Sequence, residues 1–178
     1  RSEKSTLTFW INAYNILAAK MITDNYPLES IKDAGSLFKS VWKQRAGILG
    51  GKFYTLNDIE HKILRKMNDS RIHVAIVCAS ISCPDLRLEV YSVDNLYTQL
   101  DDQMRSFLSS RDKGMKFDKQ KGRVYLSLIF KWFEEDFENY GGVLNYIGKY
   151  ITAEEKQILN DPKMEIVYLD YNWNINGY

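Results

Sequence analysis

The 178-residue chain has few of the features that mark specialised protein classes. Two cysteines are too few for a disulfide framework. With only 3 prolines and 45% hydrophobic residues, the chain is neither disordered nor collagen-like. Its 24 lysines and arginines are balanced by 23 aspartates and glutamates, so a dedicated nucleic-acid binder is excluded. No apolar run approaches the ~20 residues that a transmembrane helix needs.

The length and composition favour one globular domain. A chain of 20.8 kDa buries roughly 70% of the surface that its unfolded form exposes, so its core needs no disulfides. We therefore expect a single soluble domain over residues 1–178. Because the chain begins with Arg1 rather than Met, we also expect a truncated or processed protein.

The first segment, residues 5–25, has the apolar spacing of a helix. Phe9 and Ile16 lie opposite its broad apolar face, so we expect the helix to be buried nearly all round. Asn12 and Asn15 then belong to a narrow polar seam, and buried amides need hydrogen-bond partners. The seam faces either a polar site or the backbone of a neighbouring loop.

A second helix is predicted over residues 55–67, where Thr55 and Asp58 resemble a capping box. Glu60 projects about 40° from the centre of its apolar stripe, and His61 lies on the flank. A core-facing carboxylate is costly unless it is paired or protonated. Glu60 is therefore either a structural residue or a working acid or base. The stripe consists of Leu56, Ile59, Ile63 and Met67, with Leu64 at its edge.

The apolar segment RIHVAIVCA, residues 71–79, predicts a buried strand that contains Cys78. A cysteine in such a place is commonly a small buried hydrophobe. Cys83-Pro84-Asp85 predicts a helix start, where a thiolate is stabilised. On a strand, His73 and Cys78 point to opposite faces, so His61 is the better general base for a thiol.

The remaining chain mixes helices and strands without a regular βαβ rhythm. Hairpins are predicted around residues 50–51 and 121–122, helices over residues 92–109 and 128–140, and a closing strand over residues 164–175. This pattern predicts an α+β domain whose helices pack on a small, mainly antiparallel sheet.

A zinc site is an alternative use of the same side chains. Cys78, Cys83, His61 and His73 have the composition of a Cys₂His₂ site. The predicted orientation of His73 away from Cys78 argues against convergence of the four ligands. We therefore expect no metal and no cofactor.

Four segments together resemble the DUF547 family, a domain of unknown function in many bacterial exported proteins and in plant proteins with N-terminal coiled coils. They are FWINAYN (residues 9–15), GGKFYTLNDIEHKILR (50–65), RIHVAIVCASISCPDLR (71–87) and LDYNWNIN (169–176). The resemblance implies a periplasmic or exported protein. It implies no activity, because none is established for the family.

What the resemblance implies about the site is positional. Asn12, Asn15, the Glu60-His61 pair and Cys78 occupy motif positions of the family. A plant-like form of the pattern has Ser in place of the second cysteine. The resemblance therefore favours Cys78 as the shared thiol, whereas the predicted helix terminus favours Cys83.

Two functional hypotheses follow. The first is a thiol-dependent hydrolase or acyltransferase of papain-like or transglutaminase-like character, with Cys78 or Cys83 as nucleophile and His61 as base. Glu60 would orient the imidazole or act as a second acid or base, and Asn12 or Asn15 would stabilise an oxyanion or bind substrate. The second is a non-catalytic module that binds a peptide, a glycan or a small ligand.

Overall fold

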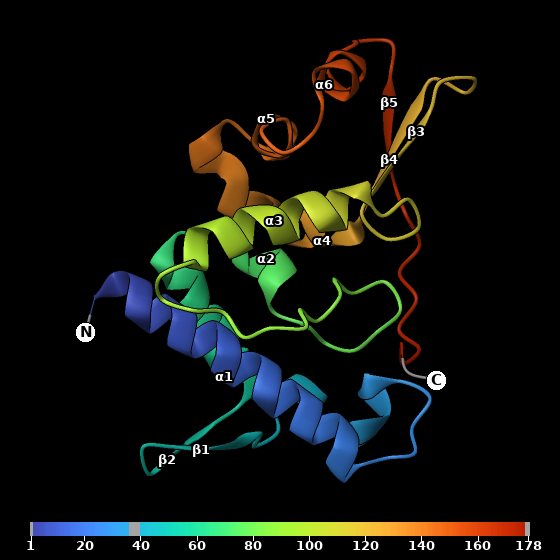
Figure 1. Cartoon of the computed structure of the whole chain (residues 1–178). Helices are drawn as coiled ribbons and strands as arrows, with labels where there is room; N and C mark the ends of the chain where they lie inside the picture. The colour runs from blue at the N-terminus through green and yellow to red at the C-terminus, as the bar shows by residue number, and fades with distance from the viewer. Residues whose placement is uncertain (1, 36–39, 177–178) are drawn as a thin grey trace. The chain divides into compact units, whose positions relative to one another are not determined.

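The computed structural model describes residues 2–35 and 40–176, and its chain forms two compact units that are treated separately below (Figure 1). Unit 1 comprises residues 1–100 and 172–178, and unit 2 comprises residues 101–171. The helices are accompanied by two small sheets, so the predicted α+β class is confirmed. Within the described ranges, no helix combines the length and the apolar character needed to span a bilayer.

The main helix of unit 1 is α1 (Glu3–Asp24), which closely matches the predicted helix. Its core face carries Ile11 and Tyr14, at 0% and 2% exposure. Phe9 and Ile16 are 41% and 64% exposed, so the expectation of burial nearly all round is wrong. The buried residues of α1 lie on the side that packs into the core cluster of unit 1, and Phe9 and Ile16 lie outside that cluster.

The predicted hairpin is formed by β1 (Gly47–Leu49) and β2 (Lys52–Tyr54). Both residues of its turn, Gly50 and Gly51, have positive φ angles, of 58° and 79°, as the two central residues of a type I′ hairpin turn require. A Cβ atom at Gly47 would lie 2.4 Å from Leu17 Cδ2. The absence of a side chain at Gly47 therefore allows the hairpin to approach α1 closely.

The second predicted helix forms, but with two different windings. η3 (Asp58–Ile63) is a π-helix and η4 (Leu64–Met67) is a 3₁₀-helix. Asp58 N–H donates to Thr55 Oγ1 at 3.0 Å, and Thr55 N–H donates to Asp58 Oδ2 at 3.3 Å, as a capping box requires. Hydrogen bonds from Lys62 and Thr55 lower the pKa of Asp58 to about 2.

The winding changes which residues are buried. A π turn holds more residues than an α turn, so the inward face shifts along the sequence. Leu64 is fully buried, whereas Ile63 and Met67 are only half-buried, in contrast to the predicted stripe. Glu60 is 8% exposed, so its predicted inward orientation is confirmed.

The strand predicted over residues 71–79 is wrong. The segment forms a short helix, α2 (Ile72–Ala75), and an extended stretch after it. Within the helical turn, Ile76 N–H donates to Ile72 O at 3.0 Å. The neighbouring backbone groups, Ala75 O and Val77 N–H, bond the side-chain amide of Asn15. The argument from strand parity about His73 therefore does not apply.

Two predicted helix starts also differ. No helix begins at Pro84, because residues 84–87 are irregular, and α3 (Leu96–Ser109) begins after Ser92. Ser92 N–H donates to Gln99 Oε1 at 2.9 Å, and Ser92 Oγ accepts from Asn95 N–H. Ser92 thus forms a turn before the helix instead of its cap.

Unit 2 contains a three-stranded sheet in which β4 pairs antiparallel with β3 and parallel with β5. A parallel pair needs a crossover, and four helical segments form it. The predicted closing strand is limited to β5, and residues after it return to unit 1. The remaining elements are η1 (Ile31–Ala34), η2 (Val41–Lys43), β3 (Met115–Asp118), β4 (Arg123–Leu126), α4 (Leu128–Trp132), η5 (Glu134–Tyr140), α5 (Val143–Ile147), α6 (Ala153–Leu159) and β5 (Glu165–Tyr168).

We expect Asn15→Ala to lower the free energy of unfolding by about 3 kcal/mol, because it leaves two buried backbone groups, Ala75 O and Val77 N–H, without their partner. Urea denaturation measures the change. Ile16→Ala, at an exposed position of the same helix, is the control and should change stability by less than about 0.5 kcal/mol. Equal effects of the two substitutions would contradict this role of Asn15.

Candidate functional site

The polar seam of α1 holds the backbone of two other segments. Asn12 Nδ2 donates to Tyr91 O at 2.8 Å, and Asn12 Oδ1 accepts from Tyr91 N–H at 3.0 Å. Asn15 does the same for α2, with Nδ2 donating to Ala75 O at 2.9 Å and Oδ1 accepting from Val77 N–H at 3.0 Å. Of the two predicted environments for the seam, the backbone of neighbouring segments is the one observed.

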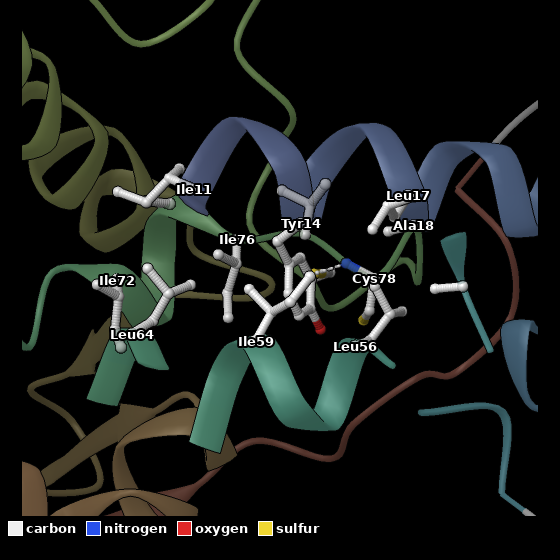
Figure 2. Packing of buried hydrophobic residues seen from close by; sticks show 14 of the residues in the cluster. Ile11, Tyr14, Leu17, Ala18, Leu56, Ile59, Leu64, Ile72, Ile76 and Cys78 are labelled. Carbon is white, nitrogen blue, oxygen red and sulfur yellow. Dashed lines mark hydrogen bonds between the residues drawn. The ribbon is translucent and has the colours of Figure 1, made fainter. Parts of the chain in front are cut away.

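Tyr14 of α1 pairs with Glu60 of η3, and the thiols of Cys78 and Cys83 lie near the Tyr14 side chain. Tyr14 OH donates to Glu60 Oε2 at 3.4 Å, and both residues are buried. Burial raises the pKa of Tyr14 well above its usual value, and the nearby Glu60, Cys78 and Cys83 raise it further. Figure 2 shows Tyr14 projecting from α1 between Ile59 and Leu56, beside Cys78. We call Tyr14, Glu60, Cys78 and Cys83 the acid–thiol cluster.

The two cysteines lie at the ends of one tight loop, residues 78–83, called the thiol loop here. Cys78 N–H donates to Cys83 Sγ at 3.0 Å, and Cys78 Sγ is 3.2 Å from Ser80 Oγ (Figure 2 shows the first bond). Between them, Ala79 has a φ of 56°, in the left-handed region that residues with a Cβ avoid. Local backbone strain of this kind is concentrated at functional sites.

The C-terminal segment, residues 172–176, fixes the other side of the thiol loop. Ile81 N–H donates to Asn174 O at 2.8 Å, and Asn176 N–H donates to Ala79 O at 2.9 Å. Ser82 contributes twice, because its N–H donates to Asn172 O and its Oγ accepts from Asn172 N–H. The chain end thus holds the strained loop in place.

The two histidines have different surroundings. His61 is half-buried beside Glu60 in the sequence, and its Nδ1 lies 3.2 Å from Arg65 Nη1. Because a guanidinium can only donate, this ring nitrogen is the acceptor and carries no proton. His73 is buried on α2. In the described part of the chain, no three His, Cys, Asp or Glu side chains gather closely enough to hold a metal ion.

The structure thus unites only some of the predicted site residues. It brings Glu60, Cys78 and Cys83 together with Tyr14, whereas it directs His61 toward Arg65 and uses Asn12 and Asn15 to hold backbone. Tyr14 is not among the predicted site residues, because its spacing places it on the apolar face of its helix. A signal was present in the hydroxyl of a tyrosine on a core-facing stripe, since a buried hydroxyl needs a polar partner.

Clefts of about 530 Å³ and 480 Å³ are lined by residues of unit 2 alone. The larger is bordered by Arg111, Lys119 and Glu154, and the smaller by Glu134, Glu138 and Tyr168. Neither includes a member of the acid–thiol cluster. Desolvation, followed by the charge of Glu134, raises the pKa of Tyr168.

The fold and the site define an α+β protein with a buried acid–thiol cluster at a strained loop. A family model described as "Protein of unknown function, DUF547" matches residues 1–108, and the chain belongs to this family. The expected family is therefore confirmed, over the segment that contains the whole acid–thiol cluster. No curated protein and no solved structure matches the chain.

The raised pKa of Tyr14 predicts a specific loss of stability at alkaline pH. Above a pH of about 10 the unfolded chain releases the Tyr14 proton while the folded chain keeps it, so ionisation favours unfolding. The free energy of unfolding of the native protein should then fall about 1.4 kcal/mol per pH unit more steeply than that of Tyr14→Phe. Urea denaturation at alkaline pH values measures this slope.

Tyr26→Phe, at a tyrosine that is 68% exposed, is the control for the alkaline experiment. It should keep the slope of the native protein. If Tyr14→Phe also keeps that slope, the Tyr14 hydroxyl is not held in its protonated form by the fold.

We expect Ala79→Gly to raise the free energy of unfolding by about 0.5–1 kcal/mol, because glycine adopts a positive φ without a steric penalty. Ala19→Gly, at an exposed helical position of α1, is the matched control and should lower the free energy of unfolding by about 1 kcal/mol, because no positive φ is relieved there. Thermal unfolding measures both changes. A destabilised Ala79→Gly variant would show that the loop is not strained.

Proposed function

We propose that the chain is a thiol-dependent hydrolase or acyltransferase that uses Cys78 as its nucleophile. One observation carries this proposal: the Tyr14 phenol pairs with the Glu60 carboxylate, and the buried Cys78 and Cys83 thiols from a third segment lie near enough to raise the pKa of that phenol. Such burial costs folding free energy, and clusters of ionisable groups with shifted pKa values are concentrated at functional sites. The π-helix that carries Glu60 supports the same conclusion, because π turns are frequent at such sites.

Three observations favour Cys78 over Cys83. Cys78 is 9% exposed and Cys83 is 3% exposed, so Cys78 is the less deeply buried of the two. Cys83 Sγ accepts the backbone N–H of Cys78, which is a structural use of that sulfur. No helix begins at Pro84, so the expected stabilisation of a Cys83 thiolate by a helix terminus has no basis.

Glu60 is the proton acceptor in this proposal. With Glu60 ionised, direct loss of the Cys78 proton to solvent would place a second anion beside the carboxylate, which is unfavourable in a buried site. Transfer of that proton to Glu60 leaves the charge of the cluster unchanged. General-base assistance by Glu60 therefore suits the cluster better than a preformed thiolate, with Tyr14 holding the carboxylate through its hydroxyl.

The proposed reaction has two steps. Cys78 Sγ attacks the carbonyl carbon of an ester or amide, its proton moves to Glu60, and the leaving group departs with that proton, which leaves a thioester on Cys78. Water then attacks the thioester and gives a proton to Glu60, and the departing sulfur takes that proton back as the acid is released. In a transferase, an amine or alcohol replaces the water.

The other predicted residues have subordinate roles. His61 is a second candidate for the base, although its Nδ1 faces Arg65. Asn12 and Asn15 are positioning residues, because each uses its amide oxygen and one N–H to hold backbone around the site. The non-catalytic module for a peptide, glycan or small ligand and the exported location both stay predictions.

Acyl trapping tests the proposal. We expect 4-nitrophenyl acetate to leave a hydroxylamine-labile acetyl group on Cys78, detected by peptide mapping after an acid quench. Cys78→Ser should abolish this thioester, and Cys83→Ser should retain it. Glu60→Gln should slow acylation by about 10²–10⁴-fold, the usual contribution of a general base. Lys66→Gln, an exposed change on η4, is the matched control.

His61→Gln separates the two candidate bases. A loss of acylation in His61→Gln but not in Glu60→Gln assigns the base to His61. If neither thiol is acylated, or if Cys78 reacts no faster in the folded protein than in urea, the thiol-enzyme proposal fails. The binding-module prediction would then be the better one.

A further inference from the structure

The outer face of the β1–β2 hairpin exposes an apolar pair that the acid–thiol cluster does not use. Ile48 and Phe53 are cross-strand partners, and they are 59% and 50% exposed. Residues that alternate with them, Leu49 and Tyr54, pack against the core of unit 1, and the Tyr54 ring lies 5.0 Å from that of Trp10. The hairpin therefore has one face on the core and one apolar face toward solvent.

The segment that carries this apolar pair is basic in sequence, and one of its basic side chains, Arg45, lies against Phe53. The sequence from residue 34 to residue 57 contains four basic residues and no acidic residue, although the whole chain has a net charge of only +1. The guanidinium carbon of Arg45 lies 4.3 Å from the centroid of the Phe53 ring, and Lys52 Nζ lies 5.3 Å from that of Tyr54. Lys43 is exposed as well.

We propose that this exposed hairpin, with Arg45, Ile48 and Phe53 on its outer face, Lys52 on β2 and Lys43 just before β1, binds the surface of an anionic lipid bilayer. The charge complementarity carries the choice of occupant, because lysine and arginine near an anionic leaflet are attracted to its headgroups. The apolar pair adds the second requirement, since a peripheral protein also buries apolar side chains at the boundary of headgroups and acyl chains.

The geometry of the hairpin suits this role. Ile48 and Phe53 form the second residue pair from the turn, and the turn itself consists of Gly50 and Gly51, which carry no side chains. The charged end of Arg45 stands beside the Phe53 ring, so cation and aromatic reach the interface together. A purely electrostatic polyanion site would have no use for two exposed apolar side chains.

Vesicle co-sedimentation of the full chain tests the proposal. We expect binding to vesicles of phosphatidylcholine with about one-third phosphatidylglycerol, weak binding to phosphatidylcholine alone, and weaker binding at high salt. Exchange of Lys43, Arg45 and Lys52 for Gln should lower the partition coefficient about a hundredfold, at about fivefold for each charge. Ile48→Ser with Phe53→Ser should lower it about tenfold or more.

Two matched controls keep the test specific. Exchange of Lys116, Lys119 and Lys121 for Gln removes the same charge from the β3–β4 hairpin and should leave binding within about threefold. Leu88→Ser removes an exposed apolar side chain elsewhere in unit 1 and should have no effect. Circular dichroism confirms that each variant is folded.

Several results would overturn the proposal. They are an absence of binding to anionic vesicles, equal binding to neutral vesicles, or equal losses in the hairpin and control variants. If the charge substitutions weaken binding but Ile48→Ser with Phe53→Ser does not, the face is a polyanion site and the bilayer proposal is wrong.

Discussion

The amide of Asn15 is the contact on which the candidate site depends. It joins the middle of α1 to the end of α2 by two hydrogen bonds. Its Nδ2 donates to Ala75 O, and its Oδ1 accepts from Val77 N–H. Cys78 follows directly, so these bonds set the position at which the thiol loop begins. Because Tyr14 precedes Asn15 on the same helix, one turn of α1 places both the phenol and the start of the thiol loop. The side-chain amide of Asn12 holds the backbone of Tyr91 by a similar pair of hydrogen bonds.

The acid–thiol cluster is unusual because each of its members is neutral when protonated and negative when not. Any negative charge in it disfavours a second one, which is why the pKa of Tyr14 is raised by its neighbours as well as by burial. A proton can nevertheless move between members without a change in total charge. This property distinguishes the cluster from a cysteine–histidine pair, in which proton transfer creates two opposite charges.

Much of the fold could be predicted from the sequence, because local signals decide it. The capping box at Thr55 and the glycine pair of the first hairpin act within a few residues, and both were predicted correctly. The segment 71–79 was predicted wrongly, because its β-branched composition suits a strand. Its hydrogen-bond partner is instead an amide on α1, far away in the sequence. No local sequence signal predicts the π winding of η3. The predicted stripe therefore contained Ile63, whereas Leu64 is the fully buried residue in the structure.

In the candidate site, too, local signals predicted some features, whereas contacts between distant segments were missed. The helical spacing predicts that the Glu60 carboxylate points inward, and Glu60 is buried in the structure. The pairing of Glu60 with Tyr14 could not be predicted from the sequence, because it joins two helices that approach each other only in the folded chain. The assignment of His61 as base relied on strand parity, which set His73 aside, and the segment that carries His73 is not a strand. The structure places His61 Nδ1 3.2 Å from Nη1 of Arg65, four residues further along the chain.

The family match and the two units have different limits. The family model covers residues 1–108, whereas unit 1 ends its first part at residue 100 and resumes at residue 172. All four members of the acid–thiol cluster lie in the matched part, but the backbone that pairs with the thiol loop comes from residues 172–176. Unit 2 is thus an insertion between two parts of one site-bearing unit.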